Sequence, residues 1–308
     1  MKKILALILA LVMSMAVFAG CGGDVDTLDA NEKAYNEAQI AKYWAFEEAY
    51  KNDGATEVLK VAISPDFAPM EFMETDKNKV VGFDVLLAMY IAKELNMKLE
   101  IVTLDFGACQ VAVQTGTVDC SISGFSVTDE RKQNCNLSDY YYAGENETEQ
   151  VIIVKADKAN KYSKADDFAG LKIGAQGASL QENLCKDQLT GAKIEVYGDI
   201  NTAVQALLSG IVDGVAVAKG NAESIMANND KVALSGFEFE VSSEEENNVV
   251  LIGKGNDDLT NKINAVLAKA YAAGLYGEWY EASKALSGIN TAAEISFDEN
   301  GNPIVDAE

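Results

Sequence analysis

The sequence predicts a two-lobed α/β protein, in which each lobe is a mainly parallel β-sheet flanked by helices and two crossover strands join the lobes. Strand-like and helix-like segments alternate from Val58 onward, which is the pattern of parallel sheets with helices on both faces. Two apolar strand patterns, at 151–154 and 249–252, lack a helix of their own and are candidate crossovers. A helix that ends in glycine and leads into a buried strand occurs twice, at 112–119 and 205–213, which indicates two similar lobes.

The individual elements follow from apolar periodicity and from the residues that bound each segment. The first lobe is predicted to have strands at 58–63, 99–102 and 118–123 and helices at 83–95, 106–115 and from 128. The second lobe is predicted to have strands at 171–175, 194–197 and 212–217 and helices at 180–189, 201–208 and 222–227. Helices at 257–273 and 276–286 close the fold. Open α/β sheets bind ligands beyond the carboxyl ends of their strands, so two facing lobes predict a cleft that closes by hinge motion.

These patterns divide the chain into consecutive parts. They are residues 1–20 as an export signal, 21–57 as a tether with a helix at 31–51, 58–147 as the first part of lobe 1, 148–250 as lobe 2 with the crossovers, 251–288 as the return helices of lobe 1, and 289–308 as a tail. The helix at 31–51 carries aromatic residues that we expect to pack on the following lobe, with docking of a partner as the alternative. The tail is turn-rich and either folds back or stays loose.

The N-terminus has the features of a bacterial export signal. Two lysines precede a stretch at 4–20 without charged residues, whose apolar core of about 15 residues is too short to span a bilayer comfortably. The stretch ends in Phe-Ala-Gly-Cys at 18–21, which resembles a lipobox, where the cysteine is acylated after the signal is removed. An ordinary cleaved signal is the alternative. We expect acylated Cys21 to anchor an extracytoplasmic protein to the cell membrane without spanning it.

Composition and charge narrow the possible functions. The net charge is −23, and it becomes more negative once the two N-terminal lysines leave with the signal, which disfavours nucleic acid as a partner. The chain has no histidine, which excludes Ser-His-Asp and Cys-His nucleophilic sites and imidazole metal sites. The cysteines after Cys21 show no CxxC spacing, and we expect no metal and no cofactor. Three of these cysteines lie in apolar patterns and are expected to be buried free thiols: Cys109, Cys120 and Cys185.

A helix start at Thr128 places an arginine where its charge needs an explanation. Thr128 is a good N-cap residue, and Arg131 falls in the first helical turn, where the helix dipole disfavours a cation. A guanidinium forms bidentate hydrogen bonds with a carboxylate, and the hydroxyl of Ser126 and the N–H groups of the turn can add donors. The sequence therefore predicts an anion site at Arg131. Pairing of Arg131 with Asp129 or another surface neighbour is the alternative.

Several short motifs follow one another in a fixed order along the two predicted lobes. In the first lobe they are Ser-Pro-Asp-Phe-Ala-Pro-Met-Glu-Phe at 64–72, Val-Gly-Phe-Asp-Val at 81–85, Gln-Thr-Gly-Thr-Val-Asp at 114–119, Ser-Gly-Phe-Ser-Val-Thr-Asp-Glu-Arg at 123–131 and Ser-Asp-Tyr-Tyr at 138–141. In the second lobe they are Leu-Lys-Ile-Gly-Ala-Gln-Gly-Ala-Ser-Leu-Gln at 171–181 and Leu-Ser-Gly-Ile-Val-Asp at 208–213. In order and spacing, over roughly 58–286, the chain resembles extracytoplasmic solute-binding proteins of family 3, the polar amino acid type, which serve ABC importers.

The resemblance implies a periplasmic-binding-protein-like fold of type II and assigns residues to the ligand's carboxylate. Arg131 and Ser126 are implied to clamp the carboxylate, and Gly124 to offer a carbonyl acceptor. In the second lobe, Ser179 is expected to cap a helix while it donates to the carboxylate, and the backbone of the same loop to approach the ligand. The family usually has a glycine where this chain has Ala178, which puts the backbone fit in question.

Further residues of the first lobe are implied to line the cleft. Phe67, in a turn bounded by two prolines, is implied to form a wall for the ligand side chain, with Phe106 as a second wall. Ser64 and Glu71 lie near enough to add polar contacts, although Glu71 alternatively braces its own loop. We expect Asp84 to cap the helix that follows a glycine at 82.

A second departure from the family concerns the ligand's amino group. Members that bind α-amino acids commonly have an aspartate five residues beyond the position of Asp213, where it pairs with the ligand's ammonium, but this chain has Ala218 there. Burial of an unpaired ammonium is costly. Either Glu223 or Asn221 therefore takes this role, with Glu223 as our first choice, or the ligand lacks an ordinary α-ammonium group. Lys219 alternatively favours a ligand with a second acidic group.

The leading hypothesis is a monomeric substrate-binding lipoprotein without enzymatic activity. It captures an amino acid or related small carboxylate between its lobes and delivers it to an ABC permease in the membrane. The second hypothesis is an enzyme on the same fold, such as a dehydratase acting on a cyclic carboxylate, with Glu71 and Glu223 as candidate acids or bases. The third is a stand-alone sensory receptor that docks a partner through the helix at 31–51.

Overall fold

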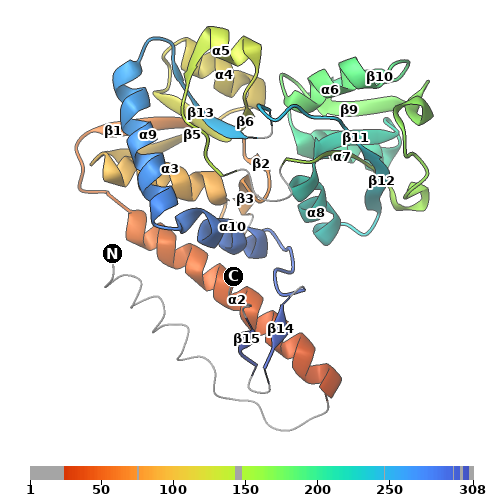
Figure 1. Cartoon of the computed structure of the whole chain (residues 1–308), viewed down its shortest axis with the longest axis horizontal. Coiled ribbons are helices and arrows are strands. Elements are labelled where there is room, and N and C mark those ends of the chain that lie inside the picture. Colours follow the sequence, from red (N-terminus) through yellow and green to blue (C-terminus); the bar gives the residue numbers. More distant parts are fainter. Residues whose placement is uncertain are drawn as a thin grey trace.

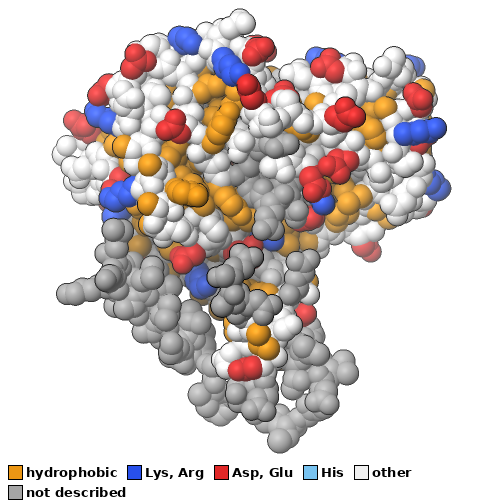
Figure 2. All heavy atoms as spheres, in the orientation of Figure 1, with side chains coloured by type: hydrophobic (Ala, Val, Ile, Leu, Met, Phe, Trp, Pro, Cys, Tyr) orange, Lys and Arg blue, Asp and Glu red, His pale blue; other side chains and the backbone are white. Residues whose placement is uncertain are grey.

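The computed structural model describes residues 24–74, 76–142, 148–245, 247–293, 295–298 and 301–304. They form two α/β lobes side by side, with a long N-terminal helix running along the first lobe (Figure 1). The predicted fold class is confirmed. Acidic and basic side chains are scattered over both lobes on the face that Figure 2 shows. The predicted signal and Cys21 lie outside the described residues, and none of the helices described is both long enough and apolar enough to cross a membrane.

Lobe 1 is built on a five-stranded sheet with the order β5-β1-β6-β13-β7. Its parallel strands are β1 (Val58–Ile63), β5 (Lys98–Thr103) and β6 (Cys120–Ser126). Strand β13 (Asn248–Gly253) runs antiparallel to β6 and to β7 (Cys135–Leu137). The helices of this lobe are α3 (Phe83–Glu94), α4 (Phe106–Gln114), α5 (Asp129–Asn134), α9 (Asp257–Ala272) and α10 (Leu275–Leu286).

Lobe 2 repeats this plan with the strand order β10-β9-β11-β8-β12. The parallel strands are β9 (Lys172–Gln176), β10 (Lys193–Tyr197) and β11 (Gly214–Ala218), and β8 (Gln150–Lys155) runs antiparallel to β11 and to β12 (Val232–Glu238). Its helices are α6 (Leu180–Gln188), α7 (Ile200–Ser209) and α8 (Lys219–Asn228), with short 3₁₀ turns at η1 (Ala156–Lys158) and η2 (Ala165–Phe168). The two predicted crossover strands therefore belong to different sheets. Strand β8 is part of the sheet of lobe 2, and β13 is part of the sheet of lobe 1.

The repeated helix–glycine–strand phrase makes the same turn in both lobes. Gly116 and Gly210 follow α4 and α7 with positive φ angles of 69° and 77°. The aspartate three residues after this glycine then forms two hydrogen bonds with a lysine of the parallel strand beside it in the sheet. Asp119 accepts from the backbone N–H of Lys60 at 2.7 Å and donates its own N–H to the Lys60 carbonyl at 3.0 Å. The equivalent pair of Asp213 with Lys172 has distances of 3.0 and 2.7 Å. The phrase therefore locks each buried strand against its neighbour.

Short strands were missed by the sequence analysis. β2 (Asp66–Phe67), β3 (Glu71–Glu74) and β4 (Lys79–Val81) form a small antiparallel sheet within the first lobe. β14 (Ser296–Phe297) pairs with β15 (Pro303–Ile304) in the tail. Two to four residues give no alternation that could be recognised. β12 was missed for another reason, because its register shifts between Leu234 and Glu238 and breaks the pattern.

Helix α2 (Asp24–Tyr50) and the tail form an addition to lobe 1. The helix begins before the predicted start at 31, so part of the expected tether is helical. The predicted packing on the lobe is confirmed, because Tyr43 and Phe46 are buried in its apolar core. The tail folds back along α2: the backbone N–H and hydroxyl of Thr291 donate to the side-chain oxygen of Asn36 at 2.9 and 2.8 Å. In Figure 1 the β14–β15 hairpin lies beside the helix.

The hydroxyl of Tyr43 ties α2 to the start of α3. It accepts a hydrogen bond from the Gly82 N–H at 2.7 Å and lies 3.3 Å from the Gly82 carbonyl, to which it donates. Gly82 has a φ of 126°, and a Cβ atom there would lie 2.3 Å from the Met70 carbonyl oxygen, so only glycine fits. Tyr43 therefore satisfies a buried N–H at a tight turn.

We expect Tyr43→Phe to lower the free energy of unfolding by about 1–3 kcal/mol, because it leaves the buried Gly82 N–H without an acceptor. Urea denaturation of both proteins measures the difference. Tyr271→Phe is the matched control, since Tyr271 is 77% exposed. Equal stability of the wild type and the Tyr43 variant would contradict the role given to this hydroxyl.

Candidate ligand-binding site

Hydrogen bonds between residues of lobe 1 and lobe 2 hold the two lobes together. Asp66 of lobe 1 accepts from the Gln176 side chain at 2.8 Å and from the backbone N–H of Ile200, the first residue of α7, at 2.7 Å. Ala178 of lobe 2 accepts from the Arg131 guanidinium at 2.9 Å. Residues predicted for the site from separate segments of both lobes are therefore brought to one junction.

Arg131 is buried at this junction, beside a stacked pair of aromatic rings. Its Nε donates to the Gln110 side-chain oxygen at 3.2 Å, one terminal nitrogen donates to the Ser126 carbonyl at 2.7 Å, and the other to the Ala178 carbonyl. The guanidinium carbon lies 5.4 Å from the ring centre of Phe106 and 5.1 Å from that of Phe125. These two rings stack on each other, so Phe106 supports the guanidinium from one side.

The positive charge of Arg131 has no carboxylate among its hydrogen-bond partners in the described chain. A guanidinium has five N–H donors, and three are used here, all by neutral oxygens. Burial lowers the pKa of Arg131 to about 10, so the side chain stays protonated near neutral pH. Arg131 is also the only arginine in the sequence. A buried cation whose hydrogen-bond partners in the described residues are all neutral, with N–H groups to spare, is suited to an incoming anion.

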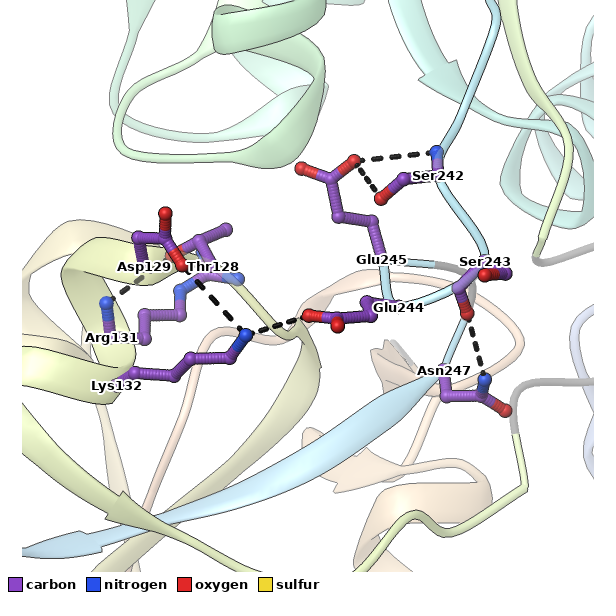
Figure 3. A network of polar contacts seen from close by, with 9 residues as sticks. All are labelled: Thr128, Asp129, Arg131, Lys132, Ser242, Ser243, Glu244, Glu245 and Asn247. Carbon is purple, nitrogen blue, oxygen red and sulfur yellow. Dashed lines mark hydrogen bonds and ion pairs between the residues drawn. The ribbon is translucent and has the colours of Figure 1, made fainter.

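The alternative that Arg131 pairs with a surface neighbour is wrong, and Lys132 has that role instead. Figure 3 shows Lys132 extending from α5 to Glu244, which lies in the second connection between the lobes. Its ammonium is 2.7 Å from the Glu244 carboxylate and 3.7 Å from Asp129. The predicted N-cap is confirmed, because the Thr128 hydroxyl accepts from the Arg131 N–H at 3.3 Å. Adjacent cations thus point in different directions, one into the protein and one to solvent.

The strand-to-helix loop of lobe 2 presents a backbone carbonyl to this guanidinium. Ala178 takes a left-handed φ of 61°, the conformation for which the family usually has glycine, and its N–H donates to Glu182 at 2.7 Å. The predicted cap at Ser179 is confirmed, since its hydroxyl accepts from the Glu182 N–H at 3.1 Å. The same hydroxyl donates to the Gln176 carbonyl at 2.7 Å, so it must turn before it can donate to a ligand.

Gly124 and Phe67 fit against each other on the lobe 1 side. Gly124 has a φ of 57°, and a Cβ atom there would lie 2.7 Å from the Phe67 ring. The ring also packs against apolar residues of lobe 2, so it lies between the lobes as expected of a wall. Ser126 is half-buried beside Arg131, with its carbonyl already bonded to the guanidinium.

Asp84 does not cap its helix as predicted; instead it braces the loop that contains Gly124. Its carboxylate accepts from the Gly124 N–H at 2.9 Å and from the Tyr141 hydroxyl at 3.0 Å. The helix start at Gly82 has no side-chain cap. Sequence spacing could not show this contact, because it joins residues forty positions apart.

Glu71 and Asp84 are both fully buried, and their carboxyl groups lie close enough to affect each other's pKa. Glu71 accepts a hydrogen bond from the Ser123 hydroxyl at 2.6 Å. This contact agrees with the alternative prediction that Glu71 braces its own loop. Burial raises the pKa of Asp84 to about 6, against the opposing effect of its hydrogen bonds. Burial and the neighbouring Asp84 together hold the pKa of Glu71 well above its usual range. The two buried carboxyl groups therefore hold their protons more tightly than exposed carboxyl groups do.

Ser64 and Asp66 form a third polar group at the junction. The Ser64 hydroxyl donates to Asp66 at 2.9 Å, so it is occupied within lobe 1. Burial raises the pKa of Asp66 to about 6, partly offset by hydrogen bonds from the Ile200 N–H and Ser64. Both residues border a pocket of about 320 Å³ between the lobes, and Asp105 and Asp199 also line it. Asp66 was missed as a junction residue, because its lobe 2 partners are distant in sequence.

The position beyond Asp213 offers no charged group at the junction. Ala218 is buried at the end of β11, and Lys219 pairs with Glu149 in the first connection between the lobes. The hydrogen bond to Glu149 raises the pKa of Lys219, and the nearby charge of Glu223 adds to this effect. Glu223 itself is half-buried on α8. Asn221 is buried instead, and its side-chain amide donates to the Ala68 carbonyl of lobe 1 at 3.0 Å.

Comparison with known proteins identifies the group to which this chain is related. Residues 59–282 match the model of the bacterial extracellular solute-binding proteins, family 3. The chain belongs to this family. The resemblance inferred from the motifs is thus confirmed, and the chain is a binding protein rather than an enzyme of the dehydratase kind. Helix α2 and the tail lie outside the matched region.

Individual relatives support the same conclusion. The arginine-binding extracellular protein ArtP of Bacillus subtilis is 31% identical over 68% of this chain and 79% of its own length. A probable histidine-binding protein of Campylobacter jejuni is 28% identical, over 70% and 85%. The structure of the substrate-binding protein AbpA of an amino acid ABC transporter from Streptococcus pneumoniae, bound to L-arginine, superimposes with a TM-score of 0.68 at 33% identity, covering 74% of this chain and 95% of that one.

The buried carboxyl groups predict that stability falls as the pH rises. The pKa values of Asp66 and Asp84 are raised to about 6, and that of Glu71 is raised well above its usual range, so the native state binds more protons than the unfolded state once the pH exceeds about 4. The stabilisation is complete below the ordinary carboxyl pKa of about 4 and is lost as the pH rises through the native values. Asp84→Asn keeps an acceptor for the Gly124 N–H and should reduce this loss. Urea unfolding at pH 4.5 and 7 measures it.

The control for this prediction is Asp258→Asn, which changes an aspartate whose side chain is 78% exposed. The decrease in unfolding free energy between the two pH values should be smaller in the Asp84 variant than in the control. An identical decrease in both would show that the raised pKa of Asp84 does not contribute to the pH dependence of stability.

Proposed function

We propose that the protein binds an amino acid between its lobes, with Arg131 as the clamp for the ligand's carboxylate. The observation that carries this proposal is the buried guanidinium whose described hydrogen-bond partners are all neutral. A carboxylate would supply the missing counter-charge and accept from the remaining N–H donors. Ser126 lies beside the guanidinium, and Ser179 lies on the lobe 2 loop that faces it. The hydroxyls of both residues can turn toward the ligand.

The ligands of related structures support the amino acid class. AbpA was solved with L-arginine, and an ancestral arginine-binding protein, 33% identical with a TM-score of 0.66, was solved with glutamine. Arginine and glutamine differ in side-chain charge but share the α-amino and α-carboxylate groups. We propose that Phe67 contacts the part of the ligand that varies, because its ring lies between the lobes.

We further propose that the protein is anchored by lipid at Cys21 and delivers its ligand to a membrane permease. The cysteine follows an export-like apolar stretch, and the relatives include binding proteins of ABC transporters. Closure of the lobes over the ligand gives the permease a form to recognise. Only a ligand that contacts both lobes shifts the population toward this form.

The carboxylate clamp is tested by thermal shift over a panel of amino acids and dicarboxylates. A ligand present at 100 times its Kd stabilises the native state by about 2.7 kcal/mol, equivalent to several degrees in Tm. We expect at least one amino acid to give such a shift with the wild type and none with Arg131→Ala. Lys132→Ala is the matched control, because this neighbouring cation bonds to Glu244 instead. A ligand whose shift survives loss of Arg131 would refute the clamp.

The lipid anchor is tested by membrane fractionation and metabolic labelling with an alkyne fatty acid. The wild type should carry the label and sediment with membranes, because its acyl chains bury apolar surface in the bilayer. Cys21→Ser should lose both properties. Cys185→Ala, which changes a buried free thiol of lobe 2, should keep both. Membrane-bound, labelled protein after loss of Cys21 would contradict the assignment.

A further inference from the structure

Asn221 carries a buried amide whose oxygen has no hydrogen-bond partner in the described part of the chain. The residue lies in the first turn of α8 and is 2% exposed. Its nitrogen donates to the Ala68 carbonyl of the opposite lobe at 3.0 Å. Because a carbonyl oxygen only accepts, the donor end of the amide must face Ala68, and this fixes the oxygen on the other side. An unpaired buried acceptor is unfavourable and calls for a partner.

This oxygen lies at the same lobe junction as the proposed binding site. Ala68 follows Phe67, whose ring rests on Gly124 and packs between the lobes. Asn221 therefore contacts the lobe 1 turn that supplies the proposed wall, and it does so from lobe 2. A ligand between the lobes would have the guanidinium at one end and this amide on its lobe 2 side.

The geometry of α8 favours Asn221 over Glu223 as the polar group directed at lobe 1. Residues two apart on a helix do not share a face. Since Asn221 faces Ala68, Glu223 points to a different side of the helix, where its charge acts on Lys219. Ala218, the residue before the helix, has no polar side chain. Our first choice of Glu223 is therefore replaced by Asn221.

We propose that the Asn221 oxygen accepts a hydrogen bond from the ligand's α-amino group, so that the site selects α-amino acids over carboxylates that lack a donor there. This inference rests on the proposed function. An amide oxygen accepts from an ammonium without neutralising it, so recognition depends on the hydrogen bond more than on charge pairing. Asn221 then holds the ligand and lobe 1 with the two ends of one amide.

The test compares two ligands in each protein by isothermal titration calorimetry. They are the amino acid with the largest thermal shift and the matching carboxylic acid without the α-amino group. The wild type should prefer the amino acid, and Asn221→Ala should weaken its binding about tenfold, or about 1.4 kcal/mol, while the affinity for the deaminated acid stays unchanged. Asn228→Ala is the control, because this asparagine of the same helix donates to Ser224 and Ser287 within its own surroundings.

The outcomes separate this inference from the proposed function. If Asn221→Ala weakens both ligands equally, the residue only supports lobe closure through Ala68, and the inference is overturned. If it weakens neither, the residue is not in the site, and the inference is again overturned. If the wild type binds no amino acid at all, the proposed function fails before Asn221 is considered. Retained binding of the deaminated acid shows that the variant cleft is intact.

Discussion

A single buried guanidinium sets the terms for the rest of the junction. Removing a cation from water costs several kcal/mol unless other groups replace the lost solvation. Here Phe106 and Phe125 stack beneath Arg131, Gln110 and the Ser126 carbonyl fix its orientation, and a carbonyl from the opposite lobe completes the set. These groups position the charge without neutralising it. This is why we propose an anion-binding capacity in the interior, at the junction of the two lobes.

The loops around this charge are held by buried acids that bind backbone N–H groups. Asp84 bonds the Gly124 N–H, and Asp66 bonds the first N–H of α7, where the helix dipole favours a negative charge. Burial and the neighbouring Asp84 hold the pKa of Glu71 well above its usual range, so two charges in this place are disfavoured. Shaping loops with carboxylates costs stability as the pH rises. In return, Gly124 keeps a positive φ and the Phe67 ring a fixed place against it. Rigid loops lower the entropic cost of ligand binding.

The sequence predicted what depends on local pattern and missed what depends on distant partners. Long periodic strands and helices, the caps at Thr128 and Ser179 and the repeated glycine turn were all recognised, because each is encoded within a few residues. Asp84 was assigned the wrong role, because its hydrogen bond with the Gly124 N–H joins residues that are distant in the sequence. The presence of one arginine in a chain rich in lysine was an available signal for Arg131 that went unused. Arginine is preferable to lysine where bidentate hydrogen bonds or stacking on aromatic rings are needed.

A carboxylate that displaced Ala178 from the guanidinium would compete with a contact between the lobes, and this would limit its affinity. In the structure Ala178, held at a φ of 61°, offers its carbonyl to Arg131 and to Gln110 at 3.2 Å. A left-handed alanine costs about 1–2 kcal/mol, so this placement must be supported by the surrounding bonds. A carboxylate that approaches the guanidinium either uses its remaining N–H groups or displaces the carbonyl. In the second case, the free energy gained is that of a charge-assisted hydrogen bond to the anion, reduced by the free energy of the lost hydrogen bond to Ala178. The more strongly Ala178 holds Arg131, the less free energy such a displacement releases.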